Sequence, residues 1–79
     1  MKLTVRYFAV LRERRGLETE VIEMPQMTAR ELADHLSHAH GLGLPAGLIR
    51  IAVDGAFVDD SVALHDGQTV VLIPPVAGG

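Results

Sequence analysis

Apolar and polar residues alternate from the second residue of the chain, and this period of two predicts a strand over residues 2–7 with one buried face. Phe8 then falls on the face opposite to the apolar set. Residues 9–15 favour a short helical turn, and a second strand is expected over residues 18–24. Because only about ten residues connect the two strands, an antiparallel hairpin is the simplest pairing. The apolar positions of the first strand are Leu3, Val5 and Tyr7.

The middle of the chain changes to a helical period. Thr28 followed by Glu31 is a capping box, in which each side chain can satisfy the backbone amide of the other residue. Gly41 supplies a residue that can turn left-handed and end the helix. The apolar stripe between these two signals consists of Ala29, Leu32, Ala33, Leu36 and Ala39. One amphipathic helix is therefore expected to pack on the strands.

The second half of the chain returns to strand patterns after a glycine-rich loop over residues 41–48. The next strands are expected over residues 49–53 and 56–58, and Asp54-Gly55 between them is a two-residue hairpin signal. The last strand, over residues 69–73, has apolar residues on both faces, as expected of a central strand.

The order of elements is strand, strand, helix, strand, short strand, strand. One helix laid across one face of a mixed sheet is an α+β arrangement. With the first and last strands adjacent and parallel in the middle, the arrangement is a ubiquitin-like β-grasp of about five strands. We interpret residues 1–79 as a single domain, with residues 74–79 as an extended C-terminal tail.

Composition narrows the function classes. The 79 residues carry a formal charge of −3, which argues against a nucleic-acid binder because such proteins need clustered positive charge. Cysteine is absent, so a disulfide framework, a thiolate zinc site and a cysteine nucleophile are excluded, and a cytoplasmic location is expected. No apolar run approaches about 18 residues, so no membrane partner is expected. A chain this short has little room for an active site of its own.

Three features of the sequence could be read as functional sites, but each also has a simpler structural explanation. His35 and His38 are three residues apart with His40 nearby, as metal ligands sometimes are, but the helix dipole also favours histidine at this end, and we predict no metal site. The loop over residues 41–47 lacks the strand, helix and Lys-Ser or Lys-Thr context of a phosphate loop. The basic residues near the N-terminus are typical of a solvated surface with local ion pairs, or of a docking surface for an acidic partner. They are Lys2, Arg6, Arg12, Arg14 and Arg15, interleaved with Glu13 and Glu18.

The end of the chain carries the most specific signal. Pro74 and Pro75 stop the last strand and favour an extended exit, and residues 74–79 can reach about 20 Å at roughly 3.3 Å per residue. Gly78 and Gly79 have no side chains and could enter a channel too narrow for other residues. The reactive group that the tail would bring into such a channel is the C-terminal carboxylate. Activation as an acyl adenylate would let a sulfur nucleophile convert it to a thiocarboxylate, and a partner enzyme must supply the nucleotide site.

Three stretches resemble a known family, the small subunit of molybdopterin synthase. The opening match is RYFAVLRE at residues 6–13, and the closing matches are LHDG at 64–67 and VVLIPPVAGG at 70–79. The resemblance covers nearly the whole chain. It implies a sulfur carrier whose terminal glycine is adenylated by a ubiquitin-activating-like adenylyltransferase, converted to a thiocarboxylate and inserted into the large synthase subunit. There it would donate sulfur to cyclic pyranopterin monophosphate, making molybdopterin.

The resemblance also implies roles for residues. Gly79 would carry the adenylate and then the thiocarboxylate, and Gly78 would thread the channel. The implied partner-binding residues are Phe8, Phe57, Ile73, Pro74, Pro75, Val76 and Ala77. The sequence departs from the family at Gln68-Thr69, where acidic residues are usual, and at Asp54-Gly55, which replaces a common Asn-containing turn. These departures bear on charge complementarity with partners rather than on the tail.

The implied assembly is a heterotetramer of two small and two large subunits, and the implied sulfur supply is a separate sulfur donor. The chain is expected to bind no cofactor and not to be an enzyme on its own, with ATP used by the activating enzyme. Sulfur carriers for thiamine, tRNA thiolation or cysteine synthesis remain alternatives, although the thiamine carrier usually lacks the opening motif. A ubiquitin-like protein modifier and a plain interaction domain with an idle tail are alternatives of other classes.

Overall fold

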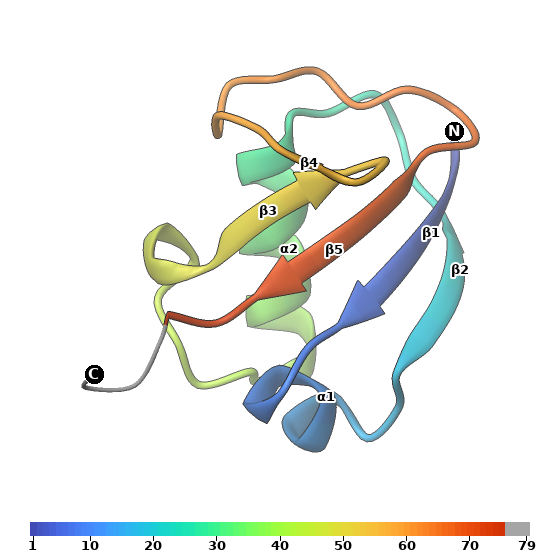
Figure 1. Ribbon diagram of the computed structural model, residues 1–79. Coiled ribbons are helices and arrows are strands. Elements are labelled where there is room, and N and C mark those ends of the chain that lie inside the picture. The colour runs from blue at the N-terminus through green and yellow to red at the C-terminus, as the bar shows by residue number, and fades with distance from the viewer. Residues whose placement is uncertain (76–79) are drawn as a thin grey trace.

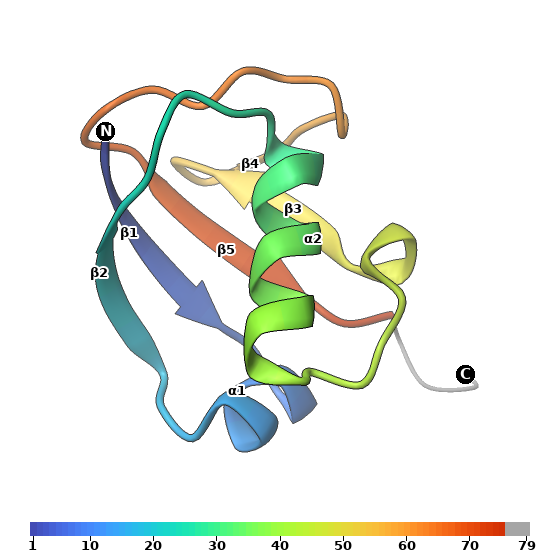
Figure 2. The same ribbon diagram turned by 180° about the vertical axis from the view of Figure 1, so that it is seen from behind.

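The computed structural model of the protein describes residues 1–75. It contains a five-stranded mixed sheet with one long helix across one face. Figure 1 looks onto the sheet with α2 behind it, and Figure 2 shows α2 from its own side. The elements are β1 (Lys2–Tyr7), α1 (Val10–Arg15), β2 (Thr19–Glu23), α2 (Ala29–His40), the 3₁₀ helix η1 (Ala46–Leu48), β3 (Arg50–Val53), β4 (Ala56–Phe57) and β5 (Thr69–Ile73).

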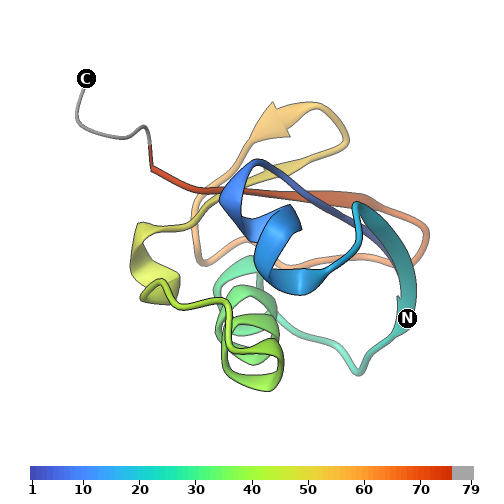
Figure 3. The same ribbon diagram turned by 90° about the horizontal axis from the view of Figure 1, so that it is seen from below.

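The strand order is β2-β1-β5-β3-β4. β1 and β5 are parallel neighbours in the centre, while β1–β2, β3–β5 and β3–β4 are antiparallel. The view from below in Figure 3 separates the sheet layer from α2. This topology confirms the predicted ubiquitin-like β-grasp, including the central position of the last strand. Within residues 1–75 no helix combines the length and the apolar character needed to cross a membrane.

The ends of α2 form as the sequence predicts. The Thr28 hydroxyl accepts a hydrogen bond from the Glu31 amide at 3.2 Å, and the Glu31 carboxylate accepts one from the Thr28 amide at 2.9 Å. Gly41 ends the helix with φ +57°, a conformation that is costly for residues with a Cβ. The capping box therefore fixes where α2 begins, and Gly41 fixes where it ends.

A single apolar core lies between the sheet and α2. β1 contributes alternate residues, α2 contributes its apolar stripe, and β5 contributes Val70 and Leu72, both fully buried. Leu64, in the connection before β5, is also fully buried. The buried core residues are Leu3, Val5, Tyr7, Leu11, Ala29, Leu32, Ala33, Leu36, Leu42, Ile49, Ile51, Val53, Leu64, Val70 and Leu72.

The hairpin between β3 and β4 is also confirmed. Asp54 has φ +49° and Gly55 has φ +89°, as the tight hairpin turn requires. The Asp54 carboxylate accepts a hydrogen bond from the Thr69 amide at 2.9 Å, and the Asp54 amide donates to the Thr69 carbonyl at 2.9 Å. The two positions where the sequence departs from the resembled family therefore meet, and they join the hairpin to the start of β5.

Some local predictions are wrong. Ala39 is exposed rather than part of the buried stripe, because the left-handed turn at Gly41 brings Leu42 into the core at this end of α2. The loop after α2 contains η1, in which the Leu48 amide donates to the Pro45 carbonyl at 2.9 Å. Proline presets a backbone angle that suits such a turn.

Candidate functional site

The sheet face opposite α2 is the open face, because no other element of the described chain covers it (Figure 1). Strand register places its side chains in rows. One row contains Arg6, Val71, Ala52 and Phe57, which are successive cross-strand partners from β1 to β4. The next row pairs Ile73 with Arg50.

Phe8 extends the second row, beside Ile73. Its amide donates to the Leu72 carbonyl at 3.2 Å, and its side chain is 56% exposed. Phe57 is 59% exposed, and Ile73 is half-buried. Neither phenylalanine belongs to the core, so both apolar rings are available to a partner. Exposed apolar groups that share one face commonly mark an interaction site.

The tail begins beside Phe8, because β1 and β5 are parallel neighbours whose C-terminal ends lie side by side. Pro74 is half-buried and Pro75 is exposed. The structure thus brings Phe8, Ile73 and Pro74 to one place and sets Phe57 on the same face two strands away. The remaining predicted site residues, Val76, Ala77, Gly78 and Gly79, lie outside the described residues.

A tight turn after β1 holds Phe8 outward. Ala9 has φ +50° and ψ −125°, a region that residues with a Cβ occupy at a cost of about 1–3 kcal/mol. The Leu11 amide closes the turn by donating to the Phe8 carbonyl at 3.0 Å, and Leu11 is fully buried. The buried Leu11 therefore anchors the turn from which the exposed Phe8 projects. A hollow of about 310 Å³ beside it is lined by Arg6, Tyr7, Phe8, Ala9, Arg12 and Glu18.

A half-buried polar cluster supports this end of β1, and sequence reasoning missed it. The Tyr7 hydroxyl donates to Glu20 Oε2 at 2.6 Å, and Arg15 binds the same carboxylate through two bonds of 3.0 and 2.9 Å. The Arg15 hydrogen bond holds the pKa of Glu20 below its usual value, while burial raises the pKa of Tyr7 well above its usual value. The cluster ties α1 and β2 to the strand that presents Phe8.

The basic residues near the N-terminus separate into groups. Arg15 is taken up by Glu20, and Arg14 donates to the Leu42 carbonyl at 2.8 Å, joining α1 to the loop after α2. Arg6 lies 3.8 Å from Glu18 in an exposed ion pair. Arg12 lines the hollow beside Phe8. Arg14 and Arg15 therefore have structural roles, whereas Arg6 lies on the open face and Arg12 lies at the hollow beside Phe8.

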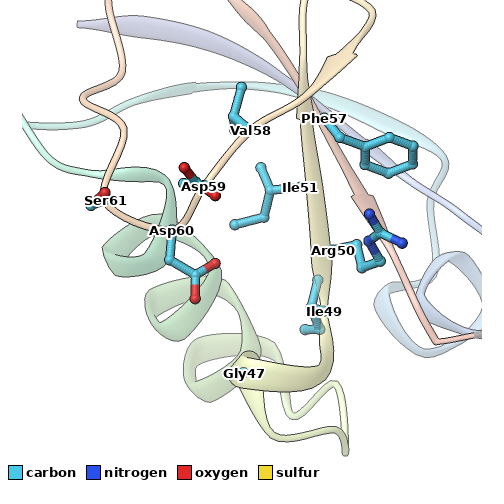
Figure 4. Close-up of a pocket in the computed structure, with 9 residues that line it drawn as sticks. All are labelled: Gly47, Ile49, Arg50, Ile51, Phe57, Val58, Asp59, Asp60 and Ser61. Atoms are coloured by element: carbon cyan, nitrogen blue, oxygen red, sulfur yellow. The ribbon is translucent and has the colours of Figure 1, made fainter.

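Arg50 is a further cation on the open face that sequence reasoning did not single out. Its guanidinium lies 4.4 Å from the centre of the Phe57 ring, within the range of a cation–π contact. Figure 4 shows the two side chains side by side, with Asp59 and Asp60 across β3 from them in this view. These residues border a surface pocket of about 470 Å³ along β3. The register Arg50–Ile73 and Ala52–Phe57 creates the contact, and one sequence offers no signal for it.

The other candidate groups form no site that the structure reveals. His35 and His38 are exposed and His40 is half-buried. Across residues 1–75, no group of three or more His, Asp or Glu side chains is placed to hold a metal ion. The glycine-rich loop after α2 leads into η1 and β3, which is not the strand-to-helix setting of a phosphate loop.

Comparison with known proteins adds family information to this geometry. The model of the ThiS family matches residues 5–79. The molybdopterin synthase sulfur carrier subunit of Drosophila melanogaster is 32% identical over 79 residues, covering 95% of this chain and 88% of that protein.

Two solved structures are also similar. The complex of subunits 1 and 2 of the molybdopterin-converting factor from Helicobacter pylori contains a chain that is 30% identical, with full coverage of both chains and a TM-score of 0.68. The small archaeal modifier protein 1 of Haloferax volcanii is 25% identical, again with full coverage of both chains and a TM-score of 0.79. The family match runs from the middle of β1 through Phe8 to the end of the tail, so the chain belongs to the ThiS family of ubiquitin-like proteins, alongside the sulfur carrier subunits of molybdopterin synthase.

Proposed function

We propose that this chain is the sulfur carrier of a molybdopterin synthase and that the carboxylate of Gly79 carries the sulfur. The observation that supports this most directly is that the sequence Pro-Pro-Val-Ala-Gly-Gly follows β5, whose last residue, the half-buried Ile73, lies beside the exposed Phe8. Family membership supports it independently. In this proposal the open face docks on a partner while the tail delivers its end to the partner's active site.

The chemistry begins with activation by a partner adenylyltransferase. A Gly79 carboxylate oxygen attacks the α-phosphorus of ATP, and pyrophosphate leaves. A sulfur nucleophile at the oxidation level of sulfide then attacks the acyl carbon, and AMP leaves with the electrons of the broken C–O bond. The product is a thiocarboxylate. This chain contributes the reacting carboxylate and the docking surface but not the nucleotide site, so we propose that it binds no cofactor and is not an enzyme alone.

In the second stage the large synthase subunit would bind the loaded carrier. Phe8, Phe57 and Ile73 would contact that subunit, with Pro74 and Pro75 leading the tail outward and Gly78 passing through the narrowest part of the channel. The complex from Helicobacter pylori, which contains two subunits of a molybdopterin-converting factor, supports a partner of this kind. We propose two carriers and two large subunits in the assembly, and a cytoplasmic location consistent with a chain free of cysteine.

Intact-protein mass spectrometry tests the chemistry. The purified chain is incubated with ATP, the activating enzyme and a sulfide donor, and the expected result is exchange of one oxygen for sulfur, localised to Gly79 by fragmentation. Gly79→Ala serves as the matched control and should gain less sulfur, because it keeps a terminal carboxylate but adds a side chain to the end that must enter the activating enzyme. A wild-type chain that gains no sulfur under these conditions contradicts the proposal.

A protein modifier is the second candidate, favoured by the likeness to the small archaeal modifier protein 1. Joined to a target lysine, Gly79 would form an amide rather than a thiocarboxylate. Immunoblots of cell extract distinguish the two functions, since conjugates give a ladder that survives reducing agent. Carriers for thiamine, tRNA thiolation or cysteine synthesis would instead load sulfur normally but fail to support molybdoenzyme activity.

A further inference from the structure

We propose that Arg50 is a recognition residue for a carboxylate on the surface of the protein partners, and that the Phe57 ring holds its guanidinium in position. This inference rests on the proposed docking role of the open face and names the chemistry of the matching partner surface. Three properties of Arg50 support it: its place on the face, its contact with Phe57 and its lack of an acidic partner in the described chain.

Arg50 lies in the row that leads to the tail. It is the cross-strand partner of Ile73, the last residue of β5, and Phe8 lies on the other side of Ile73. A partner that covers Phe8 and Ile73 while receiving the tail therefore also approaches Arg50. Figure 1 shows β3 beside β5 where β5 leads into the tail.

The contact with Phe57 gives the guanidinium a fixed place. At 4.4 Å from the ring centre, the cation lies within contact range of the aromatic ring and has reduced rotational freedom. A guanidinium held in this way keeps its planar edge of N–H donors for a carboxylate, which arginine can bind through two parallel bonds. Phe57 thereby serves as a positioning residue as well as an apolar contact.

Three of the other arginines have carboxylate partners within residues 1–75. Arg15 pairs with Glu20, Arg6 lies near Glu18, and Arg30 pairs with Asp34 and Asp60. Within residues 1–75 Arg50 has no such partner, and Asp60, which borders the same pocket, is engaged by Arg30 at 3.0 Å. Arg50 is therefore an exposed cation that no carboxylate within residues 1–75 neutralises, so it is available to a carboxylate of a partner.

Charge complementarity selects a carboxylate-bearing protein surface. The chain as a whole carries −3, yet next to Ile73 the open face presents the unpaired Arg50, and the hollow beside Phe8 is lined by Arg12 together with the Arg6–Glu18 ion pair. A partner carboxylate that faces Arg50 would therefore meet a positive group on a molecule whose net charge is negative. Such an arrangement favours one docking orientation and suppresses others.

Affinity measurements with the large synthase subunit and with the activating enzyme test the inference. The full chain and its variants are titrated by calorimetry at about 50 and 300 mM salt, where screening differs strongly. Arg50→Gln is expected to weaken binding about tenfold at low salt, Arg50→Lys less, and Arg50→Glu about a hundredfold. The loss should shrink at high salt. Arg30→Gln, an exposed arginine on α2, is the matched control and should leave binding unchanged.

Phe57→Leu tests the positioning role, since leucine keeps an apolar side chain without the aromatic face. In that background Arg50→Gln should cost less affinity than in the wild type, because the two residues act together. Wild-type binding with an unchanged affinity for Arg50→Gln, or tighter binding by Arg50→Glu, overturns the inference and leaves the proposed function standing. A wild-type chain that binds neither partner overturns the proposed function, and this inference with it. Thermal melts of each variant verify that the fold is intact.

Discussion

The two faces of the sheet are built from the same strands but differ in what their apolar residues do. On the α2 side, Leu72 is fully buried beneath the helix. On the open side, its neighbour Ile73 is half-buried and lies in a row with exposed groups. Because consecutive residues of a strand point to opposite faces, one step along β5 separates a residue that stabilises the fold from one that is available to a partner. Stability and recognition can therefore be changed separately in this molecule.

The largest expected effect lies on the covered face. Leu72→Ala leaves a cavity in the core and should lower the free energy of unfolding by about 2–5 kcal/mol, a large fraction of the stability of a small domain. Urea denaturation followed by circular dichroism measures the loss. A change below about 1 kcal/mol would show that α2 does not depend on this contact.

Phe8→Ala should have the opposite profile on the open face. Removing a ring that is 56% exposed should weaken binding to the large synthase subunit about 10- to 100-fold, as central aromatic contacts do. The free energy of unfolding should change by less than about 1 kcal/mol, since no core contact is removed. The same preparation is measured by calorimetry with the partner and by urea denaturation alone. Strong destabilisation without loss of affinity would contradict the division between the faces.

The Tyr7–Glu20–Arg15 cluster stabilises the end of β1, the strand that carries residues of both faces. Glu20→Gln should cost about 1–2 kcal/mol near neutral pH, because a charge-assisted hydrogen bond with Arg15 is lost. Since the folded pKa of Glu20 is lowered from 4.5, its contribution is present above the unfolded pKa and is lost as the pH falls through the folded one. The difference between variant and wild type should therefore narrow in acid. Urea denaturation at pH 7 and pH 3 measures it, with the exposed Glu23→Gln on the same strand as the control.

Tyr7 makes the corresponding prediction in alkali. Burial raises its pKa above the ordinary 10.0, so the protonated phenol is favoured in the folded protein. Its contribution is present below pH 10 and is lost as the pH rises toward the folded pKa. A stability profile of Tyr7→Phe should lack this alkaline decline. If the two profiles run parallel above pH 10, another group controls the decline.

The smallest effect concerns the turn that presents Phe8. Ala9→Gly should stabilise the protein by about 0.5–1 kcal/mol, because glycine relieves the positive φ while adding some chain entropy to the unfolded state. Thermal melting measures this gain. Ala63→Gly, an exposed position elsewhere, supplies the comparison and should not be stabilising. A destabilised Ala9→Gly would mean that the turn is not strained.

Much of the fold follows from local signals in the sequence. The Thr28–Glu31 capping box, Gly41 and the Asp54-Gly55 turn each specify their own backbone geometry, so the boundaries that they mark are confirmed. Ala39 was misplaced because helical spacing alone does not reveal that Leu42 covers that end of the core. The position of Phe8 on the open face was predictable from strand alternation.

The candidate site was predictable only in part, for a physical reason. Phe8, Ile73 and the tail are close along strands whose ends coincide, and the family resemblance pointed to them. The contacts of Arg50 with Phe57, and of Tyr7 with Glu20 and Arg15, depend on cross-strand register and on side-chain reach. Neither quantity is contained in the spacing of residues along one strand, so these contacts appear only in three dimensions.

The central position of β5 also has a mechanical consequence. β5 is hydrogen-bonded to β1 on one side and β3 on the other, and the tail follows directly after its last residue, Ile73. A pull on the tail therefore loads both ladders in shear, so that many hydrogen bonds resist together. A tail leaving an edge strand sideways would let the bonds peel open one at a time. A partner can grip and draw on this end of the chain while the domain behind it stays folded.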